Sequence, residues 1–470
     1  MTMWELFALI EVAWVGSMTV FLILERRSPT ATLAWILSLA VLPIVGALIY
    51  LVLGPRRLKR RKLRRATAAR SVRALVKLVD EEPDGEQRNL AQLAAAGVAA
   101  GEAPPLLARG LTLYFDGDAT YAALEAAIDA ARHHVHVEYY IFNPDEAGTR
   151  IRDALIRRAK AGVEVRMVID GVGSYAASDK FLAPLRAAGA EVAFFNSVAP
   201  SRIRLRLANF RTHRKIVVID GVVGFTGGMN VTREHAPMYT GAAAWRDTHL
   251  KIEGTAVRAL QAVFLEDWHY AHGSAPTGDA YLGRPGDGDR PVQILASGPD
   301  RDAFAIQLYY FTAIATAQHR VWITTPYFVP DEAIIRAIIS AAMRRVDVRL
   351  LIPRKGDSKI VDLAARSYVP DLLRARVKVY AYEPRMIHAK TIVVDDELAI
   401  VGSANMDNRS FRLNFEVIAA VYDGVQNSAL ADAFERDLEF ATPMTLAEFA
   451  KLGWWTRFRQ ASARLLSPLL

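Results

Sequence analysis

Two stretches of the chain carry the same residues that could do chemistry, at the same internal spacing. Each has a His, a Lys two positions later, an Asp five positions after that Lys, then a Gly-Gly or Gly-Ser pair and an Asn. The two sets are His213, Lys215, Asp220, Gly227, Gly228 and Asn230, and His388, Lys390, Asp395, Gly402, Ser403 and Asn405. β-branched residues follow each His-x-Lys and predict a strand, in which positions two apart share a face. Each set would therefore present an imidazole and an ammonium group together.

Two such sets facing each other would suit a phosphodiester. Two lysines and two asparagines could surround the non-bridging oxygens and stabilise a pentacoordinate phosphorus without a metal or another cofactor. One imidazole would attack phosphorus while the other, protonated, would give its proton to the leaving oxygen and then deprotonate the incoming alcohol or water. We therefore predict two displacements through a phosphohistidine. The expected phosphate-binding residues are Lys215, Lys390, Asn230 and Asn405.

Acidic residues complete each set. Asp247, in WRDTH, and Glu416, in NFEV, follow the two motifs at similar places in the repeat. A carboxylate on the second nitrogen of an imidazole fixes its tautomer and raises its basicity, so we expect both residues to orient histidines. Asp220 and Asp395 belong to the motifs but lie at the far ends of the expected strands, which favours a structural role for them.

The repetition extends beyond the motifs. VEVRMVID at 163–170 returns as VDVRLLIP at 346–353, and FLED at 264–267 returns as FERD at 434–437. Short β-branched runs alternate with helical stretches, which predicts an α/β fold. Two copies of one α-β-α domain, packed by pseudo-twofold symmetry, would bring the two motifs to a common interface.

The beginning of the chain predicts a membrane anchor. Residues 6–24 and 32–53 are apolar over about the 20 residues needed to cross a bilayer. Glu11 would lie inside the first of two transmembrane helices, and Pro43 would kink the second, which could instead be re-entrant. Ten basic residues and no acidic one lie between Arg56 and Arg73, which predicts a cytoplasmic catalytic part.

Charge and composition exclude some classes of function. The net charge is +8, and subtracting the ten basic residues of 56–73 leaves −2 for the rest of the chain. This balance argues against a nucleic-acid partner. The chain contains no cysteine, so neither disulfides nor thiolate chemistry is available.

These patterns divide the chain into six parts. Two membrane-spanning or re-entrant helices precede a basic juxtamembrane segment and tether, a first catalytic half, a Gly- and Pro-rich linker, a second half and an amphipathic C-terminal segment. Their bounds are 1–55, 56–105, 106–272, 273–291, 292–442 and 443–470.

The motifs resemble those of the phospholipase D superfamily over residues 106–442. Within this superfamily, six strings of the chain are similar to strings of bacterial cardiolipin synthases. They are SANMDNRSFRLNFE at 403–416, NFRTHRK at 209–215, TPYFVPD at 325–331, EYYIF at 138–142, the apolar AWILSLAVLPIVGALIYLVLGPRR at 34–57 and the terminal RLLSPLL at 464–470. The resemblance implies that two phosphatidylglycerols are joined into cardiolipin with release of glycerol. It also implies that His213 is the nucleophile, that His388 is the general acid/base, and that the chain is a multi-pass protein of the bacterial inner membrane.

Several alternatives stay open. A phospholipase D or a phosphatidylserine synthase would use the same motifs, because only the acceptor differs. Residues 201–211 could bind a headgroup or form an ordinary strand, and the C-terminal helix could lie in the membrane interface or pack across the two halves. For His133, His134 and His136 a strand edge is favoured over a metal site. The oligomeric state is left undetermined.

Overall fold

The computed structural model describes residues 2–24, 29–42, 46, 50, 88–196, 209–276, 278–283, 288–300 and 304–470. The chain divides into a small unit, residues 1–57 with 199–209, and a large unit, residues 58–198 with 210–470. The large unit contains both motifs.

The first half of the large unit is built on a seven-stranded sheet. Its strands, in spatial order, are β2 (Gly110–Tyr114), β8 (His249–Glu253), β7 (Val223–Gly227), β6 (Lys215–Ile219), β3 (His134–Tyr139), β4 (Glu164–Asp170) and β5 (Glu191–Phe195). β3, β4 and β5 are parallel, and β6 joins β3 in antiparallel register. β3 and β6 are both buried along their whole length. Burial on both faces explains the apolar run that follows Lys215 in β6, whereas β3 alternates valines with buried polar residues.

The second half repeats this order within a nine-stranded sheet. Its strands are β1 (Leu106–Ala108), β9 (Arg290–Ser297), β17 (Glu416–Tyr422), β15 (Leu398–Gly402), β14 (Thr391–Val394), β10 (Arg320–Thr324), β12 (Asp347–Pro353), β13 (Lys378–Tyr382) and β18 (Ala441–Pro443). The run from β17 to β13 matches the run from β8 to β5, strand for strand. A separate pair joins β11 (Phe328–Val329) to β16 (Met406–Asp407).

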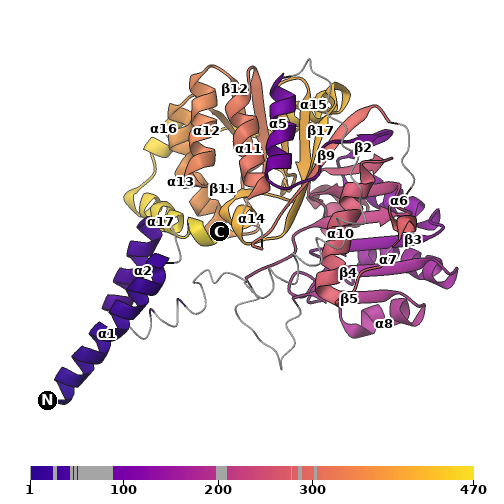
Figure 1. Ribbon diagram of the computed structural model, residues 1–470. Helices are drawn as coiled ribbons and strands as arrows, with labels where there is room; N and C mark the ends of the chain where they lie inside the picture. The colour runs from indigo at the N-terminus through magenta and orange to yellow at the C-terminus, as the bar shows by residue number, and fades with distance from the viewer. Residues whose placement is uncertain are drawn as a thin grey trace. The chain divides into compact units, whose positions relative to one another are not determined.

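Helices cover the sheets in the same way in both halves (Figure 1). One core packs the first sheet against its helices, a second packs the second sheet against its own, and a third is shared by both sheets with one helix from each half. The first-half helices are α6 (Gly117–Asp129), α7 (Glu146–Lys160), α8 (Asp179–Ala187) and α10 (Val257–His272); the second-half helices are α11 (Ala305–Thr316), α12 (Glu332–Met343), α13 (Lys359–Arg374) and α15 (Gly424–Leu438). The shared core, which contains α10 and α15, joins the two halves into one unit.

The structure differs from the expected domain boundaries at two places. β1, at the start of the expected first half, pairs with β9 in the second sheet, with Leu106 opposite Val292. Part of the expected tether forms α5 (Arg88–Ala99), whose Leu93 is buried in the core of the second half. Both segments are short and apolar, and they gain more buried surface on the second sheet than a free tether would.

The N-terminal unit contains α1 (Met3–Leu24) and α2 (Pro29–Val41), which pack through Leu22, Leu39 and Tyr50. None of the helices described in this structure is both long and apolar enough to cross a membrane, so the expected pair of transmembrane helices is not supported. α2 has 13 residues, about 20 Å at the rise of an α-helix, against about 30 Å of hydrocarbon. Pro43 and the basic run at 56–73 lie outside the described residues, as do residues 201–208.

Asp220 and Asp395 end the motif strands rather than entering the site. Both adopt a left-handed backbone, with φ of 52° and 47°. The Asp220 carboxylate accepts backbone N–H groups of Arg132, His133 and His134, at 2.8 to 2.9 Å. The Asp395 carboxylate accepts those of residues 318–320 in the same way. Each aspartate therefore ties the end of the motif strand to the beginning of the neighbouring strand.

Replacing Asp395 with Ala should destabilise the protein by about 1–3 kcal/mol, because three backbone N–H groups lose their acceptor. The matched control is Asp396→Ala, whose side chain is 79% exposed and forms an ion pair with Arg320 at 3.0 Å. That change should cost less than about 1 kcal/mol. The midpoint of denaturant unfolding measures both effects. Equal midpoints for the two variants would contradict the structural role of Asp395.

Candidate active site

The backbone of each half holds the histidine of the other half. Thr212 bridges to Phe415, and the His213 N–H donates to the Phe415 carbonyl at 2.8 Å. Arg246 bridges to Ile387, and the His388 N–H donates to the Arg246 carbonyl at 2.6 Å. Both histidines lie just before their strands, β6 and β14, in extended segments. Their side chains are nearly enclosed, with exposures of 7% and 5%.

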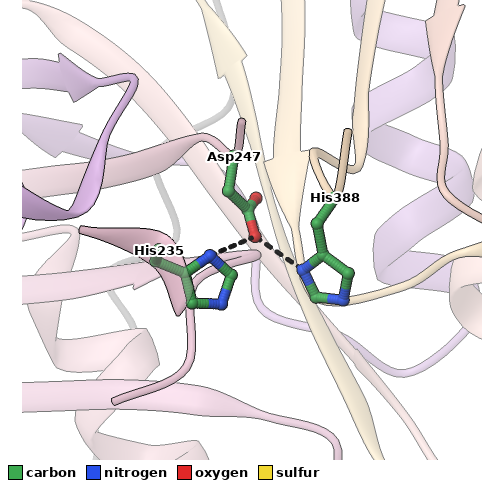
Figure 2. A group of neighbouring side chains, drawn as sticks. All are labelled: His235, Asp247 and His388. Carbon is green, nitrogen blue, oxygen red and sulfur yellow. Dashed lines mark hydrogen bonds and ion pairs between the residues drawn. The ribbon is translucent and has the colours of Figure 1, made fainter. Parts of the chain in front are cut away.

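The acidic partners are exchanged between the halves. His213 Nδ1 lies 3.0 Å from Oε2 of Glu416, which belongs to the second half. His388 Nδ1 lies 2.7 Å from Oδ2 of Asp247, which belongs to the first half (Figure 2). A carboxylate at Nδ1 places the proton there, so Nε2 of each ring is left to meet phosphorus or an oxygen. Each imidazole–carboxylate pair therefore forms only when the two halves are packed together.

The Gly-Gly and Gly-Ser pairs of the motifs match these two carboxylates. A Cβ atom at Gly228 would lie 2.1 Å from Oδ1 of Asp247, so only glycine fits there. Ser403 takes the equivalent place in the second half, and its hydroxyl donates to Glu416 at 2.5 Å. The Asp247 carboxylate instead accepts the Thr248 N–H at 2.7 Å. The second half thus uses a longer carboxylate and a hydroxyl donor where the first half uses a shorter carboxylate and no side chain.

The two motif lysines are fully enclosed beside their histidines. Nζ of Lys215 donates to the His213 carbonyl at 2.7 Å, and Nζ of Lys390 donates to the His388 carbonyl. Burial, and then the charge of Lys390, lowers the pKa of Lys215 to about 7. Burial lowers the pKa of Lys390 to about 8, against the opposing effects of Asp247 and Glu416. The ring of Tyr140 lies 5.6 Å from Nζ of Lys215 and 5.0 Å from the His213 ring. A bound anion would favour the charged form of both lysines.

Both imidazoles are neutral in the free site at neutral pH. Burial lowers the pKa of His213 to about 4, although Glu416 acts in the opposite direction. Burial, followed by the charges of Lys390 and Lys215, holds the pKa of His388 well below its usual range. Burial is the main cause for both rings, and the neighbouring lysines lower the two pKa values further. The protonated imidazole expected from the sequence belongs to the reaction with a phosphodiester, so it stays a prediction.

The two motif asparagines are also buried. Oδ1 of Asn230 accepts the Ile141 N–H at 3.3 Å. Oδ1 of Asn405 is buried and has no hydrogen-bond partner among the described residues. The backbone N–H groups of the two asparagines donate to His235 Nε2 and Ser410 Oγ, at 3.3 and 3.1 Å. The loops after both motifs are therefore fixed in the same way.

Sequence reasoning missed two buried arginines that link the halves. Arg214 donates to Asp267, the last residue of FLED, and through Nε to the Glu416 carbonyl at 3.1 Å. Arg246 binds Asp437, the last residue of FERD, with contacts of 3.0 and 2.8 Å. The repeated FLED and FERD strings were the available signal, because their shared Asp had no assigned role.

The donor atoms of His235, Asp247 and His388 lie within 4.8 Å of one another, a spacing that could hold a metal ion. The surroundings do not suit a cation. Nζ of Lys390 lies 2.9 Å from Nδ1 of His388, the atom that would bind the ion. An ammonium group at that distance opposes a second positive charge.

The other histidine cluster lies outside the site. His134 and His136 are buried in β3, with rings 4.5 Å apart. The His136 ring stacks on Phe264 at 4.5 Å and on Tyr281, from the expected linker, at 5.8 Å. Burial lowers the pKa of His134 to about 4, so this ring is also neutral. The cluster packs a helix and the linker against the sheet.

Comparisons with known proteins show which family and which fold this chain resembles. A family model described as "Cardiolipin synthase, PLD-like domain" matches residues 124–268 and 310–438, and one described as "Phospholipase D-nuclease N-terminal" matches residues 12–55. The chain is 41% identical over 458 residues to a cardiolipin synthase of Geobacillus thermodenitrificans, covering 95% of this chain and 90% of that protein. It is 38% identical to cardiolipin synthase 1 of Bacillus anthracis, covering 99% and 95%. The fold is similar to the crystal structure of a phosphatidylserine synthase from Haemophilus influenzae Rd KW20, with a TM-score of 0.61 and 15% identity over 81% of this chain and all of that one.

Replacing Lys215 with Met should remove activity but stabilise the fold. The lowered pKa of Lys215 indicates that burial costs its ammonium group more than Glu416 and Asp247 return, so an apolar chain of similar volume should raise the free energy of unfolding by up to roughly 4 kcal/mol. Because the pKa of Lys215 falls from 10.5 to about 7 on folding, its cost is complete below pH 7 and disappears as pH rises through 10.5. The gain in unfolding midpoint should therefore be largest near pH 7 and shrink toward pH 10.

The control for this prediction is Lys251→Met in the same sheet, where the ammonium group is partly exposed and 3.4 Å from Glu253. This variant should show no stabilisation at pH 7. A Lys215→Met protein with a lower midpoint than the parent at pH 7 would contradict the burial argument.

Proposed function

Because this chain belongs to the cardiolipin synthase family of phospholipase D-like enzymes, we propose that its two crossed histidine–carboxylate pairs transfer a phosphatidyl group between two lipids. It is a phosphatidyltransferase, a cardiolipin synthase that joins two phosphatidylglycerols and releases glycerol. The observation that carries the mechanism is the exchange of carboxylates, which supports a single site built from both motifs.

In the first displacement, Nε2 of His213 attacks the phosphorus of one phosphatidylglycerol. The bond from phosphorus to the terminal glycerol oxygen breaks, and His388 gives that oxygen a proton, so glycerol leaves and a phosphatidyl-histidine remains. The diester brings a negative charge between Lys215 and Lys390. This charge raises the proton affinity of the imidazole that the free site keeps neutral.

In the second displacement, His388 accepts the proton of a primary hydroxyl on a second phosphatidylglycerol. The alkoxide oxygen attacks the phosphohistidine, the phosphorus–nitrogen bond breaks, and His213 returns to its starting state. Glu416 and Asp247 hold the two rings and stabilise their charged forms. Lys215, Lys390, Asn230 and Asn405 bind the non-bridging oxygens in both steps.

The first test uses purified protein with labelled phosphatidylglycerol as the sole lipid. Cardiolipin and glycerol should form in equal amounts. Phosphatidic acid as the main product would mean that water is the acceptor, and the chain would then be a hydrolase. Phosphatidylserine formed in preference to cardiolipin when serine is added would identify the other alternative.

The two histidines can be separated with phosphatidyl-p-nitrophenol, whose leaving group needs little help from an acid. His388→Ala should release up to one equivalent of nitrophenol and retain the phosphatidyl group on His213, because the base for the second step is missing. His213→Ala should release none. The control is His269→Ala, which lies outside the site on α10. This variant should turn over at the rate of the parent protein. A burst from His213→Ala would reverse the assigned roles.

We further propose that the enzyme works at the bacterial inner membrane, with the catalytic halves on the cytoplasmic side. The apolar N-terminal segment and the basic run after it support this placement. Among the described residues, α1 and α2 expose large apolar side chains, including Trp4, Val12, Leu37 and Val41. Confinement to the lipid surface would raise the local concentration of both lipid substrates over that of competing acceptors.

The C-terminal helix supports a second membrane contact. α17 (Trp454–Leu465) packs on α13 of the second half, with Arg464 4.2 Å above the Tyr368 ring, rather than across both halves. The rings of Trp454, Trp455 and Phe458 lie 5.5 to 5.7 Å apart and are exposed. No acidic residue follows Glu448 in the chain, whereas Lys451, Arg457, Arg459 and Arg464 do. Exposed aromatics with basic neighbours suit an anionic lipid surface.

The segment that follows α17 contacts the region after the second motif. The Leu470 carbonyl accepts the N–H of Arg409, in α14 (Asn408–Arg412), at 3.0 Å. α14 begins three residues after Asn405, so the C-terminal segment is held against the helix that follows the second motif.

The absence of cysteine allows a direct test of this contact. Trp454→Cys and Met343→Cys place a single probe at two side chains that are both 73% exposed, the second at the end of α12. In the full chain on phosphatidylglycerol vesicles, an environment-sensitive dye at 454 should shift to the blue and be quenched by lipid-borne spin labels. The dye at 343 should not change. Equal emission at both positions would contradict the contact, whether or not cardiolipin is made.

A further inference from the structure

One buried histidine beside the site has no part in the mechanism above. His235 ends the short 3-10 helix η2 (Arg233–His235) and is fully buried. Its Nδ1 lies 3.6 Å from Oδ2 of Asp247, the same oxygen that is 2.7 Å from Nδ1 of His388. Figure 2 shows the carboxylate between the two rings. Asp247 is therefore shared by two imidazoles, one of which is the proposed acid/base.

The repeat provides an internal comparison for His235. It is the fifth residue after Asn230, and Ser410 is the fifth residue after Asn405. Both side chains accept the backbone N–H of their asparagine. A serine hydroxyl is sufficient for this loop contact, as the second half demonstrates. The imidazole of His235 must have another reason to be there, and its second nitrogen points to Asp247.

The hydrogen bond from Asn230 determines the tautomer of His235. Nε2 accepts that N–H, so the ring proton is on Nδ1 and faces Asp247. At 3.6 Å this is an electrostatic contact rather than a hydrogen bond. Burial lowers the pKa of His235 to about 3, so the ring stays neutral and presents a fixed N–H dipole to the carboxylate.

The rings also restrict the position of His388. The His235, Trp245 and His388 rings form a cluster with centroid separations of 5.3 to 5.4 Å. The other titratable groups that face His388 are Asp247, Lys390, Lys215 and His213. His213 has one such aromatic contact, with Tyr140. The two imidazoles of the site therefore have different surroundings, although their motifs are alike.

We propose that His235 is a positioning residue that adapts His388 to proton transfer, by sharing Asp247 with it and fixing its ring. The N–H dipole draws part of the carboxylate charge away from His388. The His388 cation is then less stabilised than it would be beside an unshared Asp247, and it gives up its proton more readily. This inference depends on the proposed function, because it assigns acid/base work to His388.

The test is His235→Ser, which copies the second half and keeps an acceptor for the Asn230 N–H. Without the dipole, Asp247 should stabilise the His388 cation better. The pH optimum of cardiolipin formation should then move up by about half a unit or more. The nitrophenol burst, which depends on His213, should keep its pH dependence. The control Ser410→Ala, on the other loop, should leave the pH optimum where it is.

His235→Gln should restore the original optimum, because its amide can supply an N–H to Asp247 and still accept the loop N–H. Unfolding midpoints for all variants identify any that fail to fold. If His235→Ser does not fold, His235→Thr, which also keeps a hydroxyl acceptor for the Asn230 N–H, takes its place with the same expected shift. A folded His235→Ser protein with an unmoved optimum would show that His235 only supports the loop. If the parent protein itself made no cardiolipin, the proposed function would be contradicted instead.

Discussion

The exchange of carboxylates between the two halves is the constraint on which the rest of the site depends. His213 is paired with Glu416, and His388 with Asp247, each across the interface between the halves. A buried charge without a partner costs several kcal/mol. Neither half could bury its own acid and lysine in isolation without that cost. Packing of the halves and formation of the site are therefore one event, and the shared core beneath the motifs supplies the apolar surface that drives it.

Two buried arginines next to the motifs are also paired with carboxylates. Arg214 and Arg246 are buried beside the two imidazole–carboxylate pairs, and each is neutralised by the final Asp of a repeated string. Arg214 also holds the carbonyl of Glu416, so a change at this arginine would move the carboxylate of the opposite half. Lys215 and Lys390 are the other buried cations, and Glu416 and Asp247 are the carboxylates that act on them. Burial is the main cause of their lowered pKa values, so a bound phosphodiester would favour the charged form of both lysines.

The local chemistry could be predicted from the sequence because it rests on short-range rules. The two-residue period of a strand predicted that His and Lys of each motif lie together. The internal repeat predicted two facing copies of one α/β domain. The pairing of Glu416 with His213 could not be predicted, because it depends on contacts between residues about 200 positions apart. Residues 106–108 were included in the expected first half, but β1 pairs with β9 of the second sheet, since three apolar residues do not specify a partner strand. The apolar N-terminal pattern predicted membrane-crossing helices, which the described part of that region does not contain.

Duplication explains the site, but a symmetric site could not divide the work between its two imidazoles. The differences between the halves are small and lie around the rings. Gly228 faces Asp247 where Ser403 donates to Glu416, and His235 stands where the second half has Ser410. Each difference changes how much negative charge the carboxylate offers its imidazole, while the strands and lysines stay alike. A duplicated fold can in this way keep one geometry for binding phosphorus and still assign attack to one ring and proton transfer to the other.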